Sequence, residues 1–278
     1  MPLTGTGEIV ARAADAARGV GAFNVIQLEH AQAIVAGARS AGTPVVLQLS
    51  ENAVRYHGGL TAIGRATLAV AEAAEVPVAV HLDHATSAEL VHQAVELGFT
   101  SVMFDASVLD YADNVRATAE VVAHCHRAGV WVEAELGEVG GKDGVHAPGV
   151  RTDPAEAAAF VAATGVDALA VAVGTSHAML TRDAALDFEL IAALRAAVPV
   201  PLVLHGSSGV ADQDLTTAVG RGMTKVNIST HLNGVFTTAA RAALAADERL
   251  VDPRRYLGPA RTATATEVAR LLKVLNAG

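Results

Sequence analysis

Short apolar runs, rich in valine, alternate along the chain with longer alanine-rich segments of helical periodicity. The apolar runs are continuous rather than alternating, which is typical of strands covered on both faces, as in parallel sheets. Eight such runs are predicted as β-strands: 21–25, 44–50, 77–83, 101–107, 130–136, 168–174, 201–207 and 224–230.

Helices are predicted between these strands, at 29–41, 61–75, 87–97, 110–128, 154–163, 187–197 and 211–220, with a last helical region from about 231. Ser87, Asp110 and Asp153 stand where helix N-caps are expected. Eight strand–helix units in about 225 residues predict an α/β fold, a (β/α)₈ TIM barrel. A doubly wound sheet is the alternative, but its GxGxxG fingerprint is missing after the first strand.

No linker, low-complexity stretch or compositional break divides the sequence, so residues 1–278 are predicted as a single barrel domain. The part beyond about 245 is expected to form a C-terminal helical arm for packing or subunit contact. Segment 137–153 is glycine-rich and longer than an ordinary connection, which places it at the C-terminal face of a barrel, where lids form.

Composition narrows the class of protein. Hydrophobic residues make up 51% and charged residues 18%, which excludes general disorder. The net charge of -9 gives no global attraction to nucleic acid or to an anionic membrane. Cys125 is the single cysteine, and the N-terminal sequence resembles no signal peptide. We therefore expect a cytoplasmic protein.

Polar residues gather where the predicted strands end, and barrel active sites form at the C-terminal ends of strands. These residues are Ser50, Asp83, His84, Asp105, Glu135, His177, His205 and Asn227. Three histidines from three strand ends, beside carboxylates, suit a divalent transition metal such as zinc, which polarises a carbonyl. The alternative is a set of ordinary polar loop residues.

A second group follows the last two strands. The segments His205–Gly209 and Asn227–Thr230 offer small residues and hydroxyl groups where barrels commonly bind phosphate, which favours a phosphorylated sugar as substrate over simple flexible turns. A Schiff-base mechanism needs a lysine at the barrel mouth. The lysines are Lys142, Lys225 and Lys273, and Lys225 is expected at the opposite end of its strand, so imine chemistry is disfavoured.

The motifs GAFNV, PVVLQLSENAVRYHGG, VHLDHA, SVMFDAS, VEAELGEVGG, VDALAVAVGTSH, LVLHGSSG, KVNIST and DPRRYLGPA follow one another through most of the chain. In this order they resemble the class II (zinc-dependent) fructose-bisphosphate and tagatose-bisphosphate aldolase family. The resemblance implies a (β/α)₈ barrel, a homodimer or homotetramer, and a lyase of carbohydrate metabolism, such as glycolysis. Such an enzyme reversibly cleaves a ketose 1,6-bisphosphate to dihydroxyacetone phosphate and an aldehyde such as glyceraldehyde 3-phosphate.

The resemblance also implies roles for residues. It makes His84, His177 and His205 the ligands of one catalytic Zn²⁺, Asp83 the acid/base at the C4 oxygen, and Asp105 and Glu135 ligands of a second cation. Ser50 matches a position near the aldehyde half. Gly206, Ser208, Asn227, Ser229 and Thr230 match the family's site for the phosphate of dihydroxyacetone phosphate, and Ala178, Ser207 and Ile228 are further substrate-binding positions.

Three departures from the family pattern concern the substrate. Ala178 stands where the family usually has glycine, and residues 180–184 (LTRDA) replace a segment that reads roughly Tyr-Lys-Gly-Glu-Pro. Arg182 is then expected to take the place of the family's lysine. In the glycine-rich segment, Asp143 would replace the family's proton-transfer glutamate.

Three other functions stay open at this point. The chain could be a class II aldolase for a different ketose 1-phosphate, a non-catalytic aldolase-like subunit, or a metal-independent phosphosugar isomerase on the same barrel. Loss of ligands would mark a non-catalytic subunit, and all three histidines and Asp83 are present.

Overall fold

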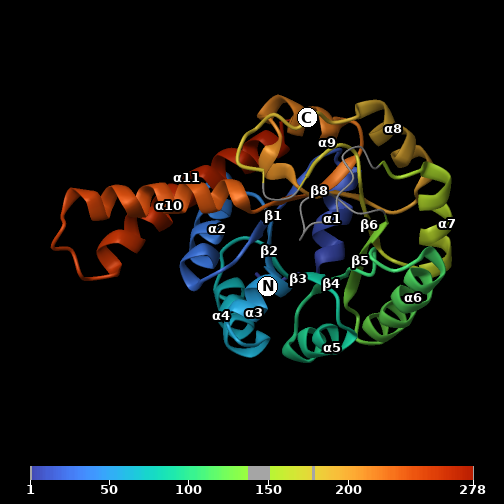
Figure 1. Ribbon diagram of the computed structural model, residues 1–278, viewed down its shortest axis with the longest axis horizontal. Helices are drawn as coiled ribbons and strands as arrows, with labels where there is room; N and C mark the ends of the chain where they lie inside the picture. The colour runs from blue at the N-terminus through green and yellow to red at the C-terminus, as the bar shows by residue number, and fades with distance from the viewer. Residues whose placement is uncertain (1, 137–150, 177–178, 278) are drawn as a thin grey trace.

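The computed structural model describes residues 2–136, 151–176 and 179–277, and eight parallel strands in it close into a barrel (Figure 1). Each strand pairs with its neighbour in sequence, and the first pairs with the last. The strands are β1 Val20–Asn24, β2 Val45–Ser50, β3 Val78–Ala85, β4 Ser101–Phe104, β5 Trp131–Leu136, β6 Ala168–Val171, β7 Leu202–Leu204 and β8 Met223–Ile228. The predicted (β/α)₈ barrel is confirmed.

Helices surround the barrel and cover the outer faces of the strands (Figure 1). Asp110 and Asp153 accept hydrogen bonds from backbone N–H groups in the first turns of α6 and α7, as predicted, whereas Ser87 makes no capping hydrogen bond. The helices between strands are α2 Leu28–Ala41, α3 Glu51–Tyr56, α4 Leu60–Glu72, α5 Ala88–Leu97, α6 Tyr111–Arg127, α7 Pro154–Thr164, α8 Phe188–Ala197 and α9 Asp212–Gly220.

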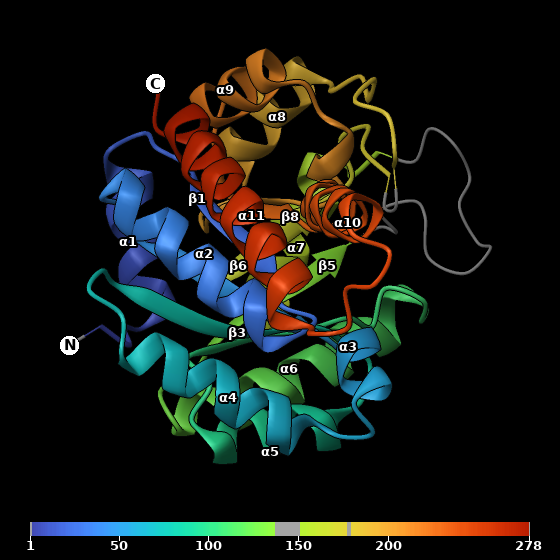
Figure 2. The ribbon, with the colours of Figure 1, turned by 90° about the vertical axis from the view of Figure 1, so that its left-hand side faces the viewer.

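Helix α1, Thr6–Asp15, was not predicted and crosses the N-terminal end of the barrel. Ile9 and Val10 on this helix pack against Val20, Val46 and Ala79 from the strand interiors. Figure 2 shows α1 at the opposite end of the molecule from α3 and α10. Burial of these apolar side chains closes the barrel from below, so the functional groups are left at the other end.

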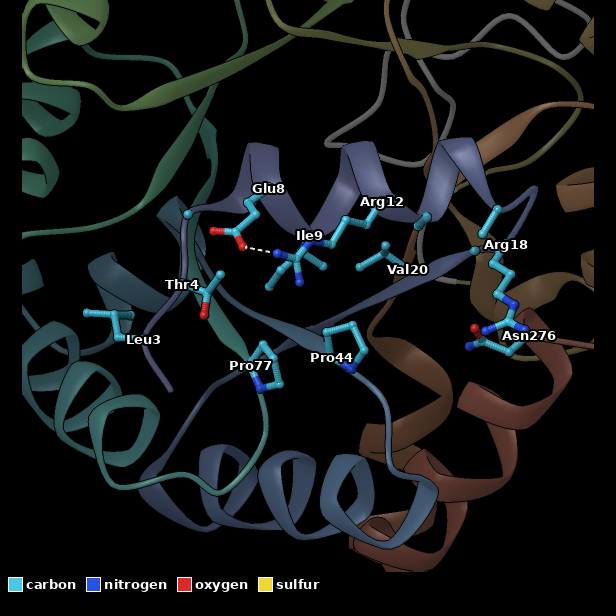
Figure 3. A pocket seen from close by; sticks show the side chains of 14 residues that line it. Leu3, Thr4, Glu8, Ile9, Arg12, Arg18, Val20, Pro44, Pro77 and Asn276 are labelled. Carbon is cyan, nitrogen blue, oxygen red and sulfur yellow. Dashed lines mark ion pairs between the residues drawn. The ribbon is translucent and has the colours of Figure 1, made fainter. Parts of the chain in front are cut away.

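A cavity of about 670 Å³ lies between α1 and the starts of the strands (Figure 3). Its lining includes Ile9, Val20, Pro44 and Pro77, with Arg12 paired to Glu8. None of the residues predicted to act in catalysis lines this cavity. Its volume therefore does not mark it as the active site.

Strands β4, β6 and β7 each end three residues earlier than predicted, and this shortening sets the positions of the polar residues. Strand β7 ends at Leu204, so His205 stands in the turn immediately after it, and β4 ends at Phe104, directly before Asp105. Strand β3 instead continues to Ala85 through an irregular register, and His84 takes a left-handed backbone conformation with φ 51°. A side chain rarely adopts this conformation, and such strain gathers at functional sites.

The last two helices form the predicted arm. Helix α10, Thr230–Ala246, runs outward from the barrel, and α11, Arg254–Leu275, returns beside it to pack on α2 (Figure 1). Within the described ranges, no helix is both long enough and apolar enough to cross a membrane.

Candidate metal and catalytic site

Two histidines from opposite sides of the barrel meet at its C-terminal mouth. Nε2 of His84 lies 3.0 Å from Nδ1 of His205, and the two rings meet edge to face. His205 is fully buried and His84 nearly so. Burial lowers the pKa of His205 although its bond to Glu133 opposes this, so the ring is neutral near neutral pH, as a metal ligand must be.

Carboxylates fix which nitrogen of each ring carries the proton. Asp105 accepts from Nδ1 of His84 at 2.8 Å, and Glu133 accepts from Nε2 of His205 at 2.9 Å. The remaining nitrogens, Nε2 of His84 and Nδ1 of His205, are the two that face each other. Two imidazole nitrogens that converge at this distance, with a carboxylate behind each ring, suit a transition metal.

Asp83 lies beside this pair and is buried. Its Oδ1 is 4.0 Å from Nε2 of His84 and accepts a hydrogen bond from Asn227, while Oδ2 accepts one from Asn24. Burial acts to raise the pKa of Asp83, but interactions with the imidazoles of His84 and His205, and then with Lys225 and His81, outweigh it and lower the pKa to about 2. The carboxylate is therefore ionised at neutral pH and able to accept a proton.

Two further carboxylates complete the cluster. Asp105 also accepts hydrogen bonds from the backbone N–H and hydroxyl of Ser107, and Glu135 places Oε2 3.5 Å from Nδ1 of His205. Two sets of residues hold ligand atoms within 4.8 Å of one another: Asp83, His84 and His205, and His84, Asp105 and Glu135. Either set could hold a metal ion.

The turns after β7 and β8 lie next to each other. The hydroxyl of Ser208 accepts hydrogen bonds from the backbone N–H groups of Ser229 and His231, at the start of α10. Ser208 and Thr230 line a cavity of about 530 Å³. Hydroxyl groups gathered next to the start of a helix suit an anion.

Gly206 allows the turn after β7 to pass close to the segment after β6. Its φ is 67°, and a Cβ there would lie 2.6 Å from the carbonyl oxygen of Ser176. A side chain at position 206 is therefore excluded both by backbone conformation and by contact.

Comparisons with known proteins agree with this geometry. The family model described as fructose-bisphosphate aldolase class-II matches residues 4–278. The chain is 40% identical to a fructose-bisphosphate aldolase of Geobacillus stearothermophilus over 283 residues, covering 100% of this chain and 99% of the relative. It is 41% identical to a fructose-bisphosphate aldolase of Thermus caldophilus, covering 95% and 94%.

The chain belongs to the class II fructose-bisphosphate aldolase family. It is therefore an enzyme of the lyase class. Among solved structures it is similar to the YdjI aldolase of Escherichia coli K12, with a TM-score of 0.86, 33% identity, and coverage of 98% of this chain and 97% of the other.

The structure brings most of the predicted aldolase residues to one end of the barrel. Ser50 caps α3, where its hydroxyl accepts from the N–H of Ala53, and the hydroxyl of Ser207 donates to the carbonyl of Leu204. Ile228 is buried in β8. His177, Ala178 and Asp143 lie outside the described residues.

One expectation about the phosphate side stays a prediction. Arg182 was expected to replace the family's lysine, but its guanidinium donates to the carbonyl of Val210 and pairs with Asp212 at 2.6 Å. These contacts tie the segment before α8 to the start of α9, and they commit the guanidinium to the protein.

The sequence interpretation missed a polar layer inside the barrel, formed by Asn24, Gln48, His81, Glu133 and Lys225. Lys225 was placed at the far end of its strand, yet its Nζ reaches Asn227 and Glu133. The sequence signal that could have revealed this layer is the spacing of two between polar residues within a strand. His81 and Asp83, Glu133 and Glu135, and Lys225 and Asn227 are each two residues apart and therefore share the inner face of a strand.

Proposed function

We propose that the chain is a zinc-dependent aldolase that reversibly cleaves a ketose 1,6-bisphosphate of the fructose or tagatose type. The products are dihydroxyacetone phosphate and an aldehyde such as glyceraldehyde 3-phosphate. The convergence of His84 and His205, directly beside the ionised Asp83, supports this proposal most strongly.

His84 and His205 would hold one Zn²⁺ together with His177. When bound, the ion supplies a Lewis acid that stabilises the negative charge developing on the ketose as the C3–C4 bond breaks. Asp105 and Glu133 hold the two imidazoles in the required tautomers. Asp105 and Glu135 would accept a second cation.

Asp83 would move the proton of the C4 hydroxyl. As the C3–C4 bond breaks, its electron pair stays on C3 and the C4 hydroxyl proton passes to the carboxylate, which leaves an aldehyde. The amides of Asn24 and Asn227 hold the two carboxylate oxygens in place for this transfer. In the reverse reaction Asp83 returns the proton to the aldehyde oxygen, and we propose Asp143 for the proton at C3.

The phosphate of dihydroxyacetone phosphate would bind at the turns after β7 and β8. Ser208, Ser229 and Thr230 supply hydroxyl groups, and Gly206, Ser207 and Ile228 supply backbone groups. Asn227 would meet the same half of the substrate, while Ser50 and position 178 would border the site. We also propose that residues 1–278 form one domain and that the chain assembles as a homodimer or homotetramer.

A related reaction on a different ketose 1-phosphate is the second candidate. It is favoured by Arg182, which is committed to Val210 and Asp212, in the segment where the family pattern has a phosphate-side lysine. A site with fewer cations would bind a doubly phosphorylated sugar less strongly.

The experiment is a cleavage screen of the zinc-loaded enzyme against fructose 1,6-bisphosphate, tagatose 1,6-bisphosphate and several ketose 1-phosphates, with enzymatic detection of dihydroxyacetone phosphate. We expect release from at least one bisphosphate. Release only from ketose 1-phosphates would support the second candidate. No release from any ketose phosphate would overturn the aldolase proposal.

A further inference from the structure

A buried ion pair lies inside the barrel directly below the two histidines. Nζ of Lys225 on β8 is 2.8 Å from Oε2 of Glu133 on β5, and both side chains are fully buried. Removing two charges from water costs several kcal/mol, and such a pair is weak evidence for stability. Because this buried pair adds little stability and lies directly below the catalytic site, its position points to a role in that site.

Glu133 connects the pair to one metal ligand. Its Oε2 faces Lys225, and its Oε1 accepts from Nε2 of His205 at 2.9 Å. The amide Nδ2 of Asn227 also lies 3.1 Å from Nε2 of His205. If Nε2 carried a lone pair instead of a proton, that lone pair would face the carboxylate of Glu133, which is closer, at 2.9 Å. The proton therefore belongs on Nε2, and the lone pair of His205 belongs on Nδ1, toward His84.

Lys225 also connects to the acid/base group, through Asn227. An ammonium group can only donate, so the Asn227 atom 2.8 Å from Nζ must be the amide oxygen. This assignment turns Nδ2 of Asn227 toward Oδ1 of Asp83, which accepts at 3.4 Å. The ammonium group of Lys225 thereby orients the Asn227 amide that donates to Asp83. It also pairs with Glu133, the carboxylate that holds the metal ligand His205.

Resting on the proposed function, we propose that Lys225 is a positioning residue for both halves of the reaction. Through Glu133 it fixes the tautomer and orientation of the ligand His205, and through Asn227 it orients the amide that holds Asp83. In this arrangement Lys225 contacts Glu133 and Asn227 and acts on His205 and Asp83 through them.

The first test is direct observation of the tautomer. Long-range ¹H–¹⁵N correlation spectra of the metal-free protein, with His205→Gln used to assign the signals, are expected to show His205 protonated at Nε2. In the Lys225→Met variant, we expect this ring to lose its single-tautomer signature. A wild-type His205 protonated at Nδ1 would overturn the inference whatever reaction the enzyme catalyses.

The second test separates the two connections. Lys225→Met should lower zinc affinity, measured by competition with a chromophoric chelator, by up to about 10-fold, the lower end of the effect of disturbing the group that hydrogen-bonds a ligand. It should also lower kcat more than it changes KM. In the double variant Lys225→Met with Glu133→Gln, no lone charge remains and the glutamine oxygen can still accept from Nε2. Zinc affinity should then recover in part, because a neutral glutamine still orients His205 but does not raise its basicity as a carboxylate does. The kcat should stay low because Asn227 has lost its donor.

Lys273→Met, an exposed position on α11, is the matched control and should leave zinc affinity and kcat unchanged. If the Lys225→Met variant fails to fold, the double variant and the wild-type spectra still test the proposal. Zinc affinity and kcat within twofold of wild type in both Lys225 variants would overturn the proposal. Absence of aldolase activity in the wild type would instead refute the proposed function and leave the tautomer test intact.

Discussion

Asp83 combines burial with a low pKa, and its neighbours account for both. Two amides donate to its oxygens and two histidines lie beside it. Replacement by asparagine keeps the shape and removes the proton acceptor. We expect Asp83→Asn to bind zinc normally but to lose about 10²–10⁴-fold in kcat, the usual contribution of general acid–base catalysis.

Zinc content and kcat of the same preparation check this prediction, with the exposed substitution Glu248→Gln as a control. Near-normal turnover in Asp83→Asn would remove Asp83 from the proton transfer. Loss of zinc instead would make Asp83 a ligand.

The conformation of Gly206 leads to a second prediction at the residue scale. In Gly206→Ala the left-handed backbone costs about 1–2 kcal/mol, and the new Cβ would meet the carbonyl of Ser176. We expect a lower Tm and a higher KM for any substrate that yields dihydroxyacetone phosphate. Gly220→Ala, on α9 with nothing within 4 Å of its Cβ, is the matched control and should not lower Tm. Equal Tm and KM in the two variants would contradict this account of the turn.

Residues at strand ends could be predicted from sequence, because a polar residue after an apolar run is a clear signal. His84, Asp83 and His205 were found in this way. Glu133 and Lys225 were not, because they lie within strands rather than after them. Only the closed barrel brings β5 and β8 within reach of each other, and a single sequence does not give that distance.

At the scale of elements, continuous apolar runs predicted all eight strands because both faces of each strand are covered. The sequence did not predict α1, whose single apolar stripe lies between charged residues and which gains its stability from closing the barrel. The sequence-based prediction also treated α3 as part of the loop before α4. In the structure Ser50 caps this separate helix, and Gly58 and Gly59, both with positive φ, separate it from α4.

The contact between α2 and α10 contains a buried histidine with a testable effect on stability. His30 stacks on Phe236 at a ring distance of 4.6 Å, and neither ring nitrogen has a hydrogen-bond partner among the described residues. Burial lowers the pKa of His30, against the opposing charge of Glu29. An unsatisfied buried polar group costs about 1–3 kcal/mol, so His30→Leu should raise Tm at pH 7.

The same substitution should act more strongly in acid. As the pH falls through 6.5, the unfolded chain protonates His30 more readily than the folded protein, whose His30 pKa is lowered, so the wild type loses stability. The Tm difference between His30→Leu and wild type should therefore be larger at pH 5 than at pH 7. Thermal unfolding of the metal-free proteins measures it, and a difference that shrinks toward pH 5 would contradict the burial argument.

At the scale of the whole molecule, the arm of α10 and α11 extends beyond the barrel (Figure 1). Leu244 and Val251, near its outer end, are exposed apolar side chains, with Val251 88% exposed. Apolar groups exposed on a projecting element fit a subunit contact. We expect light scattering to give a mass of two or four times 28.3 kDa.

Val251→Asp should shift this assembly toward smaller species, because a charge would be buried at the contact. Arg249→Asp, exposed in the same segment, is the control for charge alone. A monomeric wild type would refute the assembly, and equal behaviour of the two variants would move the contact elsewhere.

The central claim is that the convergent histidines make cleavage depend on a metal, and metal reconstitution tests it most directly. Protein stripped with a chelator is assayed for release of dihydroxyacetone phosphate, with metal content measured in the same sample, and zinc is then added in steps. We expect no cleavage from the stripped protein, full recovery at about one zinc per chain, and no recovery in His205→Ala. Undiminished cleavage by protein shown to be free of metal would contradict the account.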